Sequence, residues 1–172
     1  MHIILIGYRG TGKTSVGRKL AEKLKAPFYD TDQMIVDHIG KTIKQWVEEK
    51  GWESFRQEEK AVIRAISSLD FGIIALGGGA VMDPENRDVL RQKGLIVWLT
   101  ADIQTIMERM KADPRNQYNR PALSEKDWET EIQEVLTQRI PVYRRLADFS
   151  IDTDGKTMEE VAEELVALIR KY

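Results

Sequence analysis

Nine residues near the N-terminus, GYRGTGKTS at Gly7 to Ser15, combine three glycines, one lysine and two adjacent hydroxyl side chains. Residues 7–14 match G-x-x-x-x-G-K-[ST] between a short apolar run and a helical pattern, which is the setting that this motif requires. Glycines let the loop turn its N–H groups toward phosphate oxygens, and the following helix N-terminus adds a favourable field. A purely structural turn is the alternative. The setting favours a site for the phosphates of a nucleoside triphosphate.

Two side chains of this loop have the chemistry that phosphoryl transfer needs. Lys13 is expected to bridge the β- and γ-phosphates, and the hydroxyl of Thr14 is expected to bind Mg²⁺. The other loop residues that we expect to bind the nucleotide are Gly10, Thr11, Gly12 and Ser15. Motors, GTPases and small-molecule kinases share this motif, so residues elsewhere must decide where the phosphoryl group goes.

Two carboxylates, Asp30 and Asp32 in the segment DTD, follow a short apolar stretch at 28–29. The carboxyl ends of strands in an open parallel sheet face the ligand crevice. On an extended backbone the two side chains point the same way. One can then reach Mg²⁺ while the other binds or deprotonates an acceptor hydroxyl. Solvated acids that cap a turn are the alternative.

Three consecutive glycines, Gly77 to Gly79, follow an apolar run at 72–76, where a motor-type ATPase has a metal-binding Asp. Such a run is costly in backbone entropy. Either a ligand approaches the backbone closely or the segment is a flexible turn. In FRQEE, Arg56 lies at the edge of an apolar stripe and needs an anion, which is either Glu59 at i+3 or a ligand.

Short apolar runs alternate with amphipathic patterns along the chain. Strands are predicted at 2–6, 28–29, 72–76, 95–99 and 149–151. Helices are predicted at 14–26, 42–51, 55–69, 84–94 and 103–110, and after residues 127 and 157. This alternation predicts an α/β fold with three layers, α/β/α, around a five-stranded parallel sheet.

The composition bounds the possible functions. The chain of 172 residues has 42% hydrophobic residues, a net charge of −2, no cysteine and two histidines. Disulfide scaffolds and thiol catalysis are excluded, and a histidine-rich metal site is not expected. The balanced charge gives little support for binding to nucleic acid or an anionic membrane. No segment approaches the ~20 apolar residues of a membrane span or resembles a signal peptide. We expect one cytoplasmic domain.

Together these motifs resemble the shikimate kinase family, in one consistent order over most of the chain. The segments that carry the resemblance are GYRGTGKTSVG (7–17), DTD (30–32), FRQEE (55–59), GGGAV (77–81), NRP (119–121) and RIPVYRRLA (139–147). The resemblance implies a P-loop kinase architecture like that of nucleoside monophosphate kinases. It also implies transfer of the γ-phosphoryl group of ATP, with Mg²⁺, to the 3-hydroxyl of shikimate, in the pathway to chorismate and the aromatic amino acids.

The same resemblance assigns roles to residues of this sequence. It implies that Asp32 holds the shikimate hydroxyls and is the general base, and that Asp30 reaches Mg²⁺ through water. Arg56 and Arg139 are implied to bind the substrate carboxylate. The backbone that faces the substrate is that of Gly77, Gly78 and Gly79, with Gly78 presenting its N–H. A forked cation at one end and an acceptor at the other suit a small anion with vicinal hydroxyls.

Two more arginines receive roles from the resemblance. Arg120 corresponds to a lid arginine that folds over the phosphates, and Arg109 to one that packs on the adenine. A solvated loop residue is the alternative for Arg120, and a charge that favours the helix dipole is the alternative for Arg139. The single domain, 1–172, is then divided into a core, a substrate-binding region, a lid and C-terminal core elements, at 1–30 with 70–111, at 31–69, at 112–124 and at 125–172.

Two other functions stay open at this point. Another P-loop metabolite kinase, such as a gluconate kinase, shares the nucleotide chemistry but gives no reason for Arg56 and Arg139 around a glycine turn. A non-catalytic ATP-binding module gives no reason for the presence of both Asp32 and Arg120. We expect a monomeric enzyme that binds shikimate and ATP, without nucleic acid or membrane partners.

Overall fold

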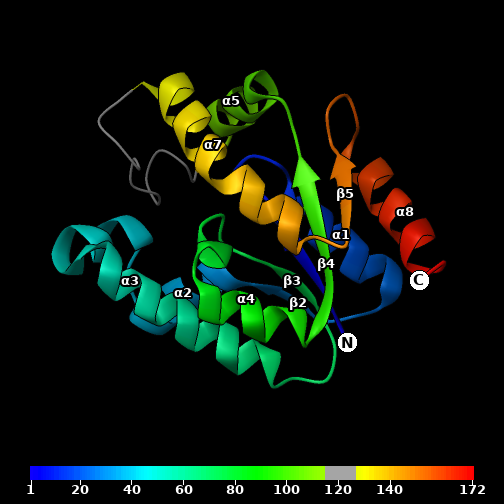
Figure 1. Cartoon of the computed structure of the whole chain (residues 1–172), viewed down its shortest axis with the longest axis horizontal. Coiled ribbons are helices and arrows are strands. Elements are labelled where there is room, and N and C mark those ends of the chain that lie inside the picture. The colour runs from blue at the N-terminus through cyan, green and yellow to red at the C-terminus, as the bar shows by residue number, and fades with distance from the viewer. Residues whose placement is uncertain (115–126) are drawn as a thin grey trace.

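The computed structural model describes residues 1–114 and 127–172 (Figure 1). Its strands are β1 (His2–Ile6), β2 (Phe28–Asp30), β3 (Ile73–Ala75), β4 (Gly94–Thr100) and β5 (Phe149–Asp152). Its helices are α1 (Lys13–Leu24), α2 (Thr31–Ile39), α3 (Ile43–Ser67), the 3₁₀ turn η1 (Ala80–Met82), α4 (Pro84–Arg91), α5 (Ile103–Ala112), α7 (Trp128–Leu146) and α8 (Met158–Ile169). Within these residues the sheet has five strands, all parallel, in the order β2-β3-β1-β4-β5. The predicted α/β fold is confirmed.

The central strand β1 explains the layered arrangement. All five of its residues are buried, as expected for a parallel strand that is covered on both faces. Ile4 and Ile6 belong to one hydrophobic cluster, and Ile3 and Leu5 belong to another. Because successive side chains point to opposite faces of a strand, β1 separates two cores.

Each core is closed by its own helices. The cluster around Ile4 contains residues of α2, α3, α4 and α7, whereas the cluster around Leu5 contains residues of α1 and α8. Figure 1 shows α1 and α8 together at one side of the sheet and α3 with α4 at the other. A third, smaller cluster joins α5 and α7 through Ile106, Met110 and Ile132, and it includes Tyr8 from the loop after β1.

The sheet order places three sequence motifs side by side. β2, β3 and β1 are neighbours, and they end in Asp30, Ala75 and Ile6. The DTD segment begins with the last residue of β2, the glycine run starts two residues after the end of β3, and the P-loop directly follows β1. Because the strands are parallel, the three segments meet at the carboxyl edge of the sheet, where open α/β sheets bind ligands.

Two predictions about the region after β2 need correction or refinement. No helix was predicted at 31–39, but α2 occupies these residues, with Asp30 as its N-cap. The predicted break at Gly51 is present as a kink inside α3, where Gly51 has φ 82° and ψ 167°. That left-handed φ suits glycine, which has no Cβ. The helices on each side of the kink therefore change direction at one residue.

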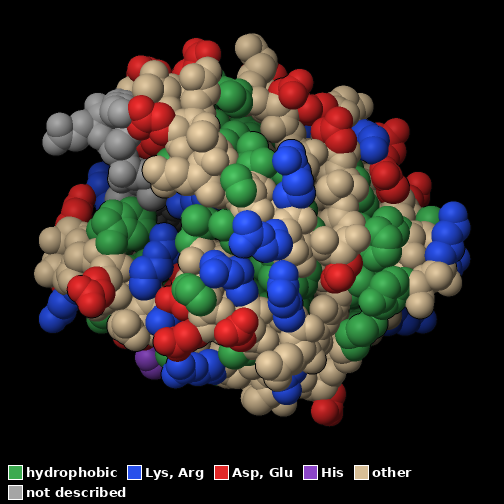
Figure 2. All heavy atoms as spheres, viewed as in Figure 1, with side chains coloured by type: hydrophobic (Ala, Val, Ile, Leu, Met, Phe, Trp, Pro, Cys, Tyr) green, Lys and Arg blue, Asp and Glu red, His purple; other side chains and the backbone are tan. Residues whose placement is uncertain are grey.

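Charged side chains of both signs are interspersed on the face that Figure 2 shows, with Lys and Arg grouped near its centre over α4 and the C-terminal part of α7. The last turns of these helices carry Arg91, Arg144 and Arg145. Cations there are favourable to the negative ends of the helix dipoles, which accounts for the grouping. No helix among the described residues has the length and apolarity to cross a bilayer.

The start of β4 generates a prediction about stability. Gly94 pairs with His2 of β1, and a Cβ at Gly94 would collide with the carbonyl oxygen of His2. We expect Gly94→Ala to destabilise the protein by about 1–3 kcal/mol because backbone must move to relieve the contact. For a chain of this size each kcal/mol lowers the melting temperature by about 2–4 °C, which differential scanning calorimetry measures.

The exposed residue Ser150 in β5 offers a matched control, since Ser150→Ala changes a strand residue without such a collision. We expect that variant to stay within about 0.5 kcal/mol of the wild type. Equal melting temperatures for Gly94→Ala and Ser150→Ala would contradict the collision.

Candidate functional site

The P-loop has the backbone shape that its sequence predicts. Gly10 has φ 81° and Gly12 has φ 95°, values that residues with a Cβ rarely adopt. Gly12 is the N-cap of α1, so the loop leads into the helix N-terminus. The ammonium of Lys13 donates to the carbonyls of Gly7 at 2.8 Å and Tyr8 at 2.9 Å. The loop thus places a cation and a helix N-terminus together, which suits phosphate binding.

Thr14 and Asp30 meet beside this loop. The Thr14 hydroxyl donates to Oδ2 of Asp30 at 2.7 Å. Oδ1 of Asp30 accepts the N–H groups of Asp32 and Gln33, which fixes the carboxylate as the N-cap of α2. A hydroxyl and a carboxylate are oxygen ligands of the kind that Mg²⁺ prefers. Among residues 1–114 and 127–172, no cluster of three or more His, Cys, Asp or Glu offers a closed metal cage.

The reason given for pairing Asp30 with Asp32 is wrong. An extended backbone was expected to aim both carboxylates the same way, but helix α2 begins at Thr31, and Asp32 lies in its first turn. Asp30 is therefore turned toward Thr14, while Asp32 faces Gly77. The two carboxylates therefore point to different partners, because Asp32 lies in the first turn of a helix and not on an extended strand.

One cavity lies along the P-loop, and we call it the P-loop cavity. It is lined by Arg9, Gly10, Gly12, Lys13, Thr14, Ser15, Asp30, Asp32, Ala75, Leu76, Gly78, Arg109, Ala112, Asp113 and Met158. Arg109 is held at its edge by bonds to the carbonyl of Gly10 at 3.2 Å and to Thr153 at 2.8 and 2.9 Å. Thr11 does not line it, because its buried hydroxyl donates to the carbonyl of Tyr8. The geometry gives no support to a nucleotide contact by the Thr11 side chain.

The glycine run explains how further side chains converge. A Cβ on Gly77 would lie 2.6 Å from Oδ1 of Asp32 and 3.0 Å from Oε2 of Glu59. A Cβ on Gly78 would lie 3.2 Å from Nη1 of Arg139. A Cβ on Gly79 would lie 2.5 Å from Nη2 of Arg56.

None of these three glycines has a positive φ. Glycine is therefore needed here because a Cβ would collide with neighbouring side chains, and not because of the backbone conformation. From the sequence, we expected either the close approach of a ligand or a flexible turn at this run. In the structure, the space beside each glycine contains a different functional side chain of the protein itself. The alternative of a flexible turn is not supported, because the turn is packed on all three residues.

Arg56 and Glu59 form an ion pair one turn apart on α3. Nη1 of Arg56 donates to Oε1 of Glu59 at 2.7 Å, so the i+3 partner proposed from the sequence is present. The guanidinium also lies 5.4 Å from the ring centre of Trp52 and 5.2 Å from that of Phe55. Two aromatic rings and a carboxylate thus fix the direction of this cation.

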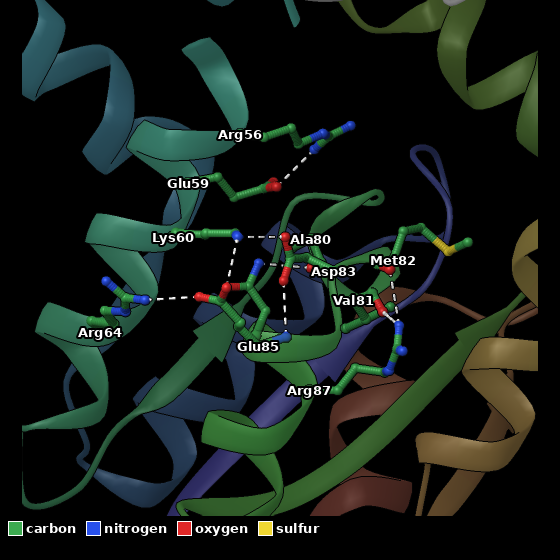
Figure 3. Close-up of polar contacts among 11 residues, drawn as sticks. Arg56, Glu59, Lys60, Arg64, Ala80, Val81, Met82, Asp83, Glu85 and Arg87 are labelled. Atoms are coloured by element: carbon green, nitrogen blue, oxygen red, sulfur yellow. Dashed lines mark hydrogen bonds and ion pairs between the residues drawn. The ribbon is translucent and has the colours of Figure 1, made fainter. Parts of the chain in front are cut away.

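Further ion pairs hold α3 against the start of α4 (Figure 3). Lys60 contacts Asp83 at 2.8 Å and Glu85 at 3.4 Å. Arg64 contacts Glu85 at 2.8 Å. In Figure 3 the Arg56–Glu59 pair lies along the same helix, beside the segment that contains Ala80. These contacts fix the part of α3 that carries Arg56 relative to the glycine run.

A second cavity lies between α3, α7 and the glycine run, and we call it the arginine cavity. It is lined by Tyr8, Arg9, Asp32, Ile43, Trp52, Phe55, Arg56, Glu59, Gly77, Gly78, Gly79 and Arg139. Arg139 lies in the middle of α7, whereas the basic residues of the last turn are Arg144 and Arg145. A role of Arg139 at the helix C-terminus is therefore excluded by its position.

Two buried tyrosines brace this cavity. The hydroxyl of Tyr143, one turn after Arg139 on α7, donates to the carbonyl of Gly78 at 2.5 Å. Burial raises the pKa of Tyr143 to about 12, so its hydroxyl remains a donor even in alkaline solution. The guanidinium of Arg139 lies 5.8 Å from the ring centre of Tyr8. The side chain of Arg139 thus extends from α7 to the Tyr8 ring of the P-loop.

Glu59 is the buried acid of the site, with a side chain that is 1% exposed. Its Oε2 has no hydrogen-bond partner within the described part of the chain. Burial raises the pKa of Glu59 from 4.5 to about 7, although the Arg56 guanidinium opposes this shift. Asp32 adds to the shift by like-charge repulsion. The cavity therefore holds a carboxyl group whose proton affinity is raised by its surroundings.

Sequence reasoning missed part of the arginine cavity. Trp52 was not among the predicted site residues, but it lines the cavity beside Arg56. Tyr8 and Tyr143 were not singled out, since their contacts depend on residues that are distant in sequence. Arg120, the NRP segment and residues 115–124 of the expected lid lie outside the described residues.

The pKa of Glu59 leads to a prediction about pH and stability. Between about pH 4.5 and 7 the folded protein keeps this proton and the unfolded chain loses it, so stability falls as pH rises, by about 1.4 kcal/mol per unit. Glu59→Gln removes this loss. We expect the unfolding free energy of the variant, minus that of the wild type, to rise by about 2–3 kcal/mol from pH 5 to pH 8 in urea titrations.

Glu53→Gln, at an exposed position of α3, is the matched control. Its difference from the wild type is expected to stay flat over the same pH range. A flat difference for Glu59→Gln as well would show that burial does not control the protonation of Glu59.

Comparisons with known proteins agree with this geometry. The family model described as shikimate kinase matches residues 9–170. A shikimate kinase of Syntrophus aciditrophicus is 43% identical, over 96% of this chain and 89% of its own length. A structure of shikimate kinase from Acinetobacter baumannii in complex with shikimate has a TM-score of 0.91 and 34% identity, over 99% of this chain and 93% of that one.

A gluconokinase from Sinorhizobium meliloti covers 99% of this chain and 91% of its own, with a TM-score of 0.60 and 18% identity. At that identity the likeness extends to the fold alone. The family model and the relatives above 30% identity span nearly the full length of the chain. The chain belongs to the shikimate kinase family.

Proposed function

We propose that this protein transfers the γ-phosphoryl group of ATP to the 3-hydroxyl of shikimate, which yields shikimate 3-phosphate and ADP. The observation that carries the proposal is the convergence of Arg56, Arg139 and Asp32 on the glycine run, directly beside the P-loop. The match to the shikimate kinase family model supports the same function. The reaction belongs to the route to chorismate and the aromatic amino acids. The proposal includes a monomeric enzyme in the cytoplasm.

The two arginines suit the carboxylate of the acceptor. Arg56 comes from α3 and Arg139 from α7, so they approach the arginine cavity from two walls. Guanidinium groups bind carboxylates through paired N–H donors, which fixes the orientation of the bound anion as well as its position. A substrate carboxylate held there leaves the hydroxyl end of the molecule directed toward Asp32 and the P-loop cavity. The backbone of Gly77, Gly78 and Gly79 forms the floor.

Asp32 is proposed as the general base. It lines both cavities, so its carboxylate lies where an acceptor hydroxyl and the nucleotide phosphates would meet. A base within hydrogen-bond reach removes the hydroxyl proton as the oxygen attacks phosphorus. Glu59 also approaches Gly77, but it lines the arginine cavity alone and its Oε1 accepts from Arg56. The two acids therefore differ in role, with Asp32 as the proton acceptor and Glu59 as the partner of Arg56.

ATP is proposed to bind in the P-loop cavity with its phosphates on Gly10, Gly12, Lys13 and Ser15. Thr14 and Asp30 would hold Mg²⁺, since their oxygen atoms already lie together and suit a hard cation. Mg²⁺ would supply charge neutralisation for the phosphates. Arg109 is proposed to contact the adenine from the edge of the cavity. The role of Arg120 over the phosphates stays a prediction from the family resemblance.

The first measurement is ADP release from Mg-ATP with shikimate, with gluconate, or with no acceptor. We expect stimulation by shikimate alone, because the chain belongs to the shikimate kinase family. Stimulation by gluconate would keep the P-loop assignment and reject the acceptor. ATP binding without turnover on either acid would favour a non-catalytic ATP-binding module.

The position of Gly79 gives a sharper test of the acceptor site. Gly79 has φ −94° and ψ −7°, which alanine adopts without strain. A Cβ there would nevertheless push on the guanidinium of Arg56, at 2.5 Å from Nη2. We expect Gly79→Ala to raise the KM for shikimate about 10–100-fold, the range that corresponds to loss of a charged hydrogen bond. Steady-state kinetics with each substrate varied in turn measures this.

The KM for ATP serves as the internal control in the same experiment, and it is expected to change less than twofold. A rise in both KM values would indicate a general disturbance of the turn. An unchanged KM for shikimate would reject Arg56 as a ligand of the acceptor.

A further inference from the structure

The P-loop cavity and the arginine cavity have three lining residues in common, namely Arg9, Asp32 and Gly78. A phosphoryl group that passes from a nucleotide to an acceptor must cross the junction that these residues form. Asp32 is an acid, and Gly78 contributes backbone. Arg9 is the one cationic side chain that lines both cavities in the described part of the chain. The P-loop pattern does not require arginine at this position, which is one of its four variable positions.

The side chain of Arg9 is oriented by helix α7 and by its neighbour Tyr8. Nη2 of Arg9 forms an ion pair with Oε1 of Glu131, and Nε lies 3.4 Å from the hydroxyl of Tyr8. The guanidinium lies 5.7 Å from the centre of the Tyr8 ring. The Arg9 side chain is 13% exposed, whereas that of Glu131, on α7, is only 2% exposed. Such a pair is held at a defined place rather than solvated at the surface.

We propose that Arg9 is a catalytic residue that contacts the phosphoryl group during its transfer, and that Glu131 is the residue that positions Arg9. This proposal rests on the proposed function, because it assumes transfer from ATP in one cavity to an acceptor in the other. A guanidinium has five donors, so it can serve a protein carboxylate and a ligand oxygen at the same time. Glu131 orients the guanidinium of Arg9, and the P-loop places Arg9 at the junction of the two cavities.

The reaction gives this cation a specific task. The acceptor oxygen forms a bond to the γ-phosphorus, and its proton passes to Asp32. The bond from the γ-phosphorus to the bridging oxygen breaks, and the electron pair stays on that oxygen in ADP. Charge is spread over the three equatorial oxygens of the transferred group in the transition state. A donor fixed at the junction stabilises that charge without reorganisation, which lowers the barrier to the chemical step.

A purely structural ion pair between the P-loop and α7 makes different predictions. It would affect folding, and it would change both substrate affinities through the shape of the loop. A contact made mainly in the transition state lowers kcat and leaves the KM values nearly unchanged. The separation of kcat from KM and from melting temperature therefore distinguishes the two roles.

The experiment compares Arg9→Gln with the wild type in shikimate-dependent ADP release. We expect kcat to fall about 10²–10³-fold, as for loss of one preorganised donor, with each KM changed less than threefold. Arg9→Lys retains the charge but not the fork, and it is expected to recover only part of the lost rate.

Removal of Arg9 leaves the buried carboxylate of Glu131 without this cation, so Arg9→Gln is expected to be less stable. The double variant Arg9→Gln/Glu131→Gln removes that charge and keeps the test possible if the single variant does not fold. We expect Glu131→Gln alone to lower kcat about tenfold with little change in KM. The double variant is expected to be no slower than Arg9→Gln, because a positioning residue has no effect once its target is absent.

Lys23→Gln removes a cation that pairs α1 with Glu159 and Glu163 of α8, outside both cavities, and it is the matched control with wild-type kcat. The proposal is overturned if the Arg9 variants keep kcat within threefold of the wild type, or if their losses lie in KM and melting temperature alone. If the wild type shows no turnover with shikimate, the proposed function itself has failed. These two failures are distinguishable in one set of assays.

Discussion

The absence of side chains on Gly77, Gly78 and Gly79 is the constraint on which the rest of the site depends. Each glycine leaves space that a different group uses: the Asp32 and Glu59 carboxylates, the Arg139 guanidinium, and the Arg56 guanidinium. These groups come from α2, α3 and α7, whereas the glycine run itself follows β3. Because the turn follows a strand between β1 and β2, it brings these groups within reach of the P-loop. Three sequence-distant elements thus converge on three residues.

Burial of Glu59 is the cost of fixing Arg56. A lone carboxylate in a buried place is destabilising, and pairing with a cation offsets only part of that cost. The raised pKa of Glu59, about 7, is the measurable sign of the imbalance. What the fold gains is a guanidinium with a defined direction, held by Glu59 and two aromatic rings at the wall of the arginine cavity. Local stability is thereby reduced where the direction of the Arg56 guanidinium is fixed.

The sequence predicted the features that depend on local pattern. The P-loop, the five strands and the i+3 pair of Arg56 with Glu59 are all present, because short spacings determine them. The helix at 31–39 was missed because Asp30 and Asp32 were interpreted as ligands on an extended chain. Asp is a preferred N-cap residue, and that signal pointed to the helix. The bond from Tyr143 to Gly78 was beyond prediction, since only the tertiary fold brings residues 65 positions apart together.

Helix α7 provides a rigid support that motif reasoning did not reveal. Arg139 and Tyr143 are separated by four residues and therefore share a face of the helix. Tyr143 donates to the carbonyl of Gly78, and Arg139 packs against the same glycine. Burial raises the pKa of Tyr143 to about 12, so the hydroxyl stays protonated even well above physiological pH. Glu131 on the same helix pairs with Arg9 of the P-loop. One helix therefore fixes the glycine run and the P-loop relative to each other, so the two cavities keep a constant junction.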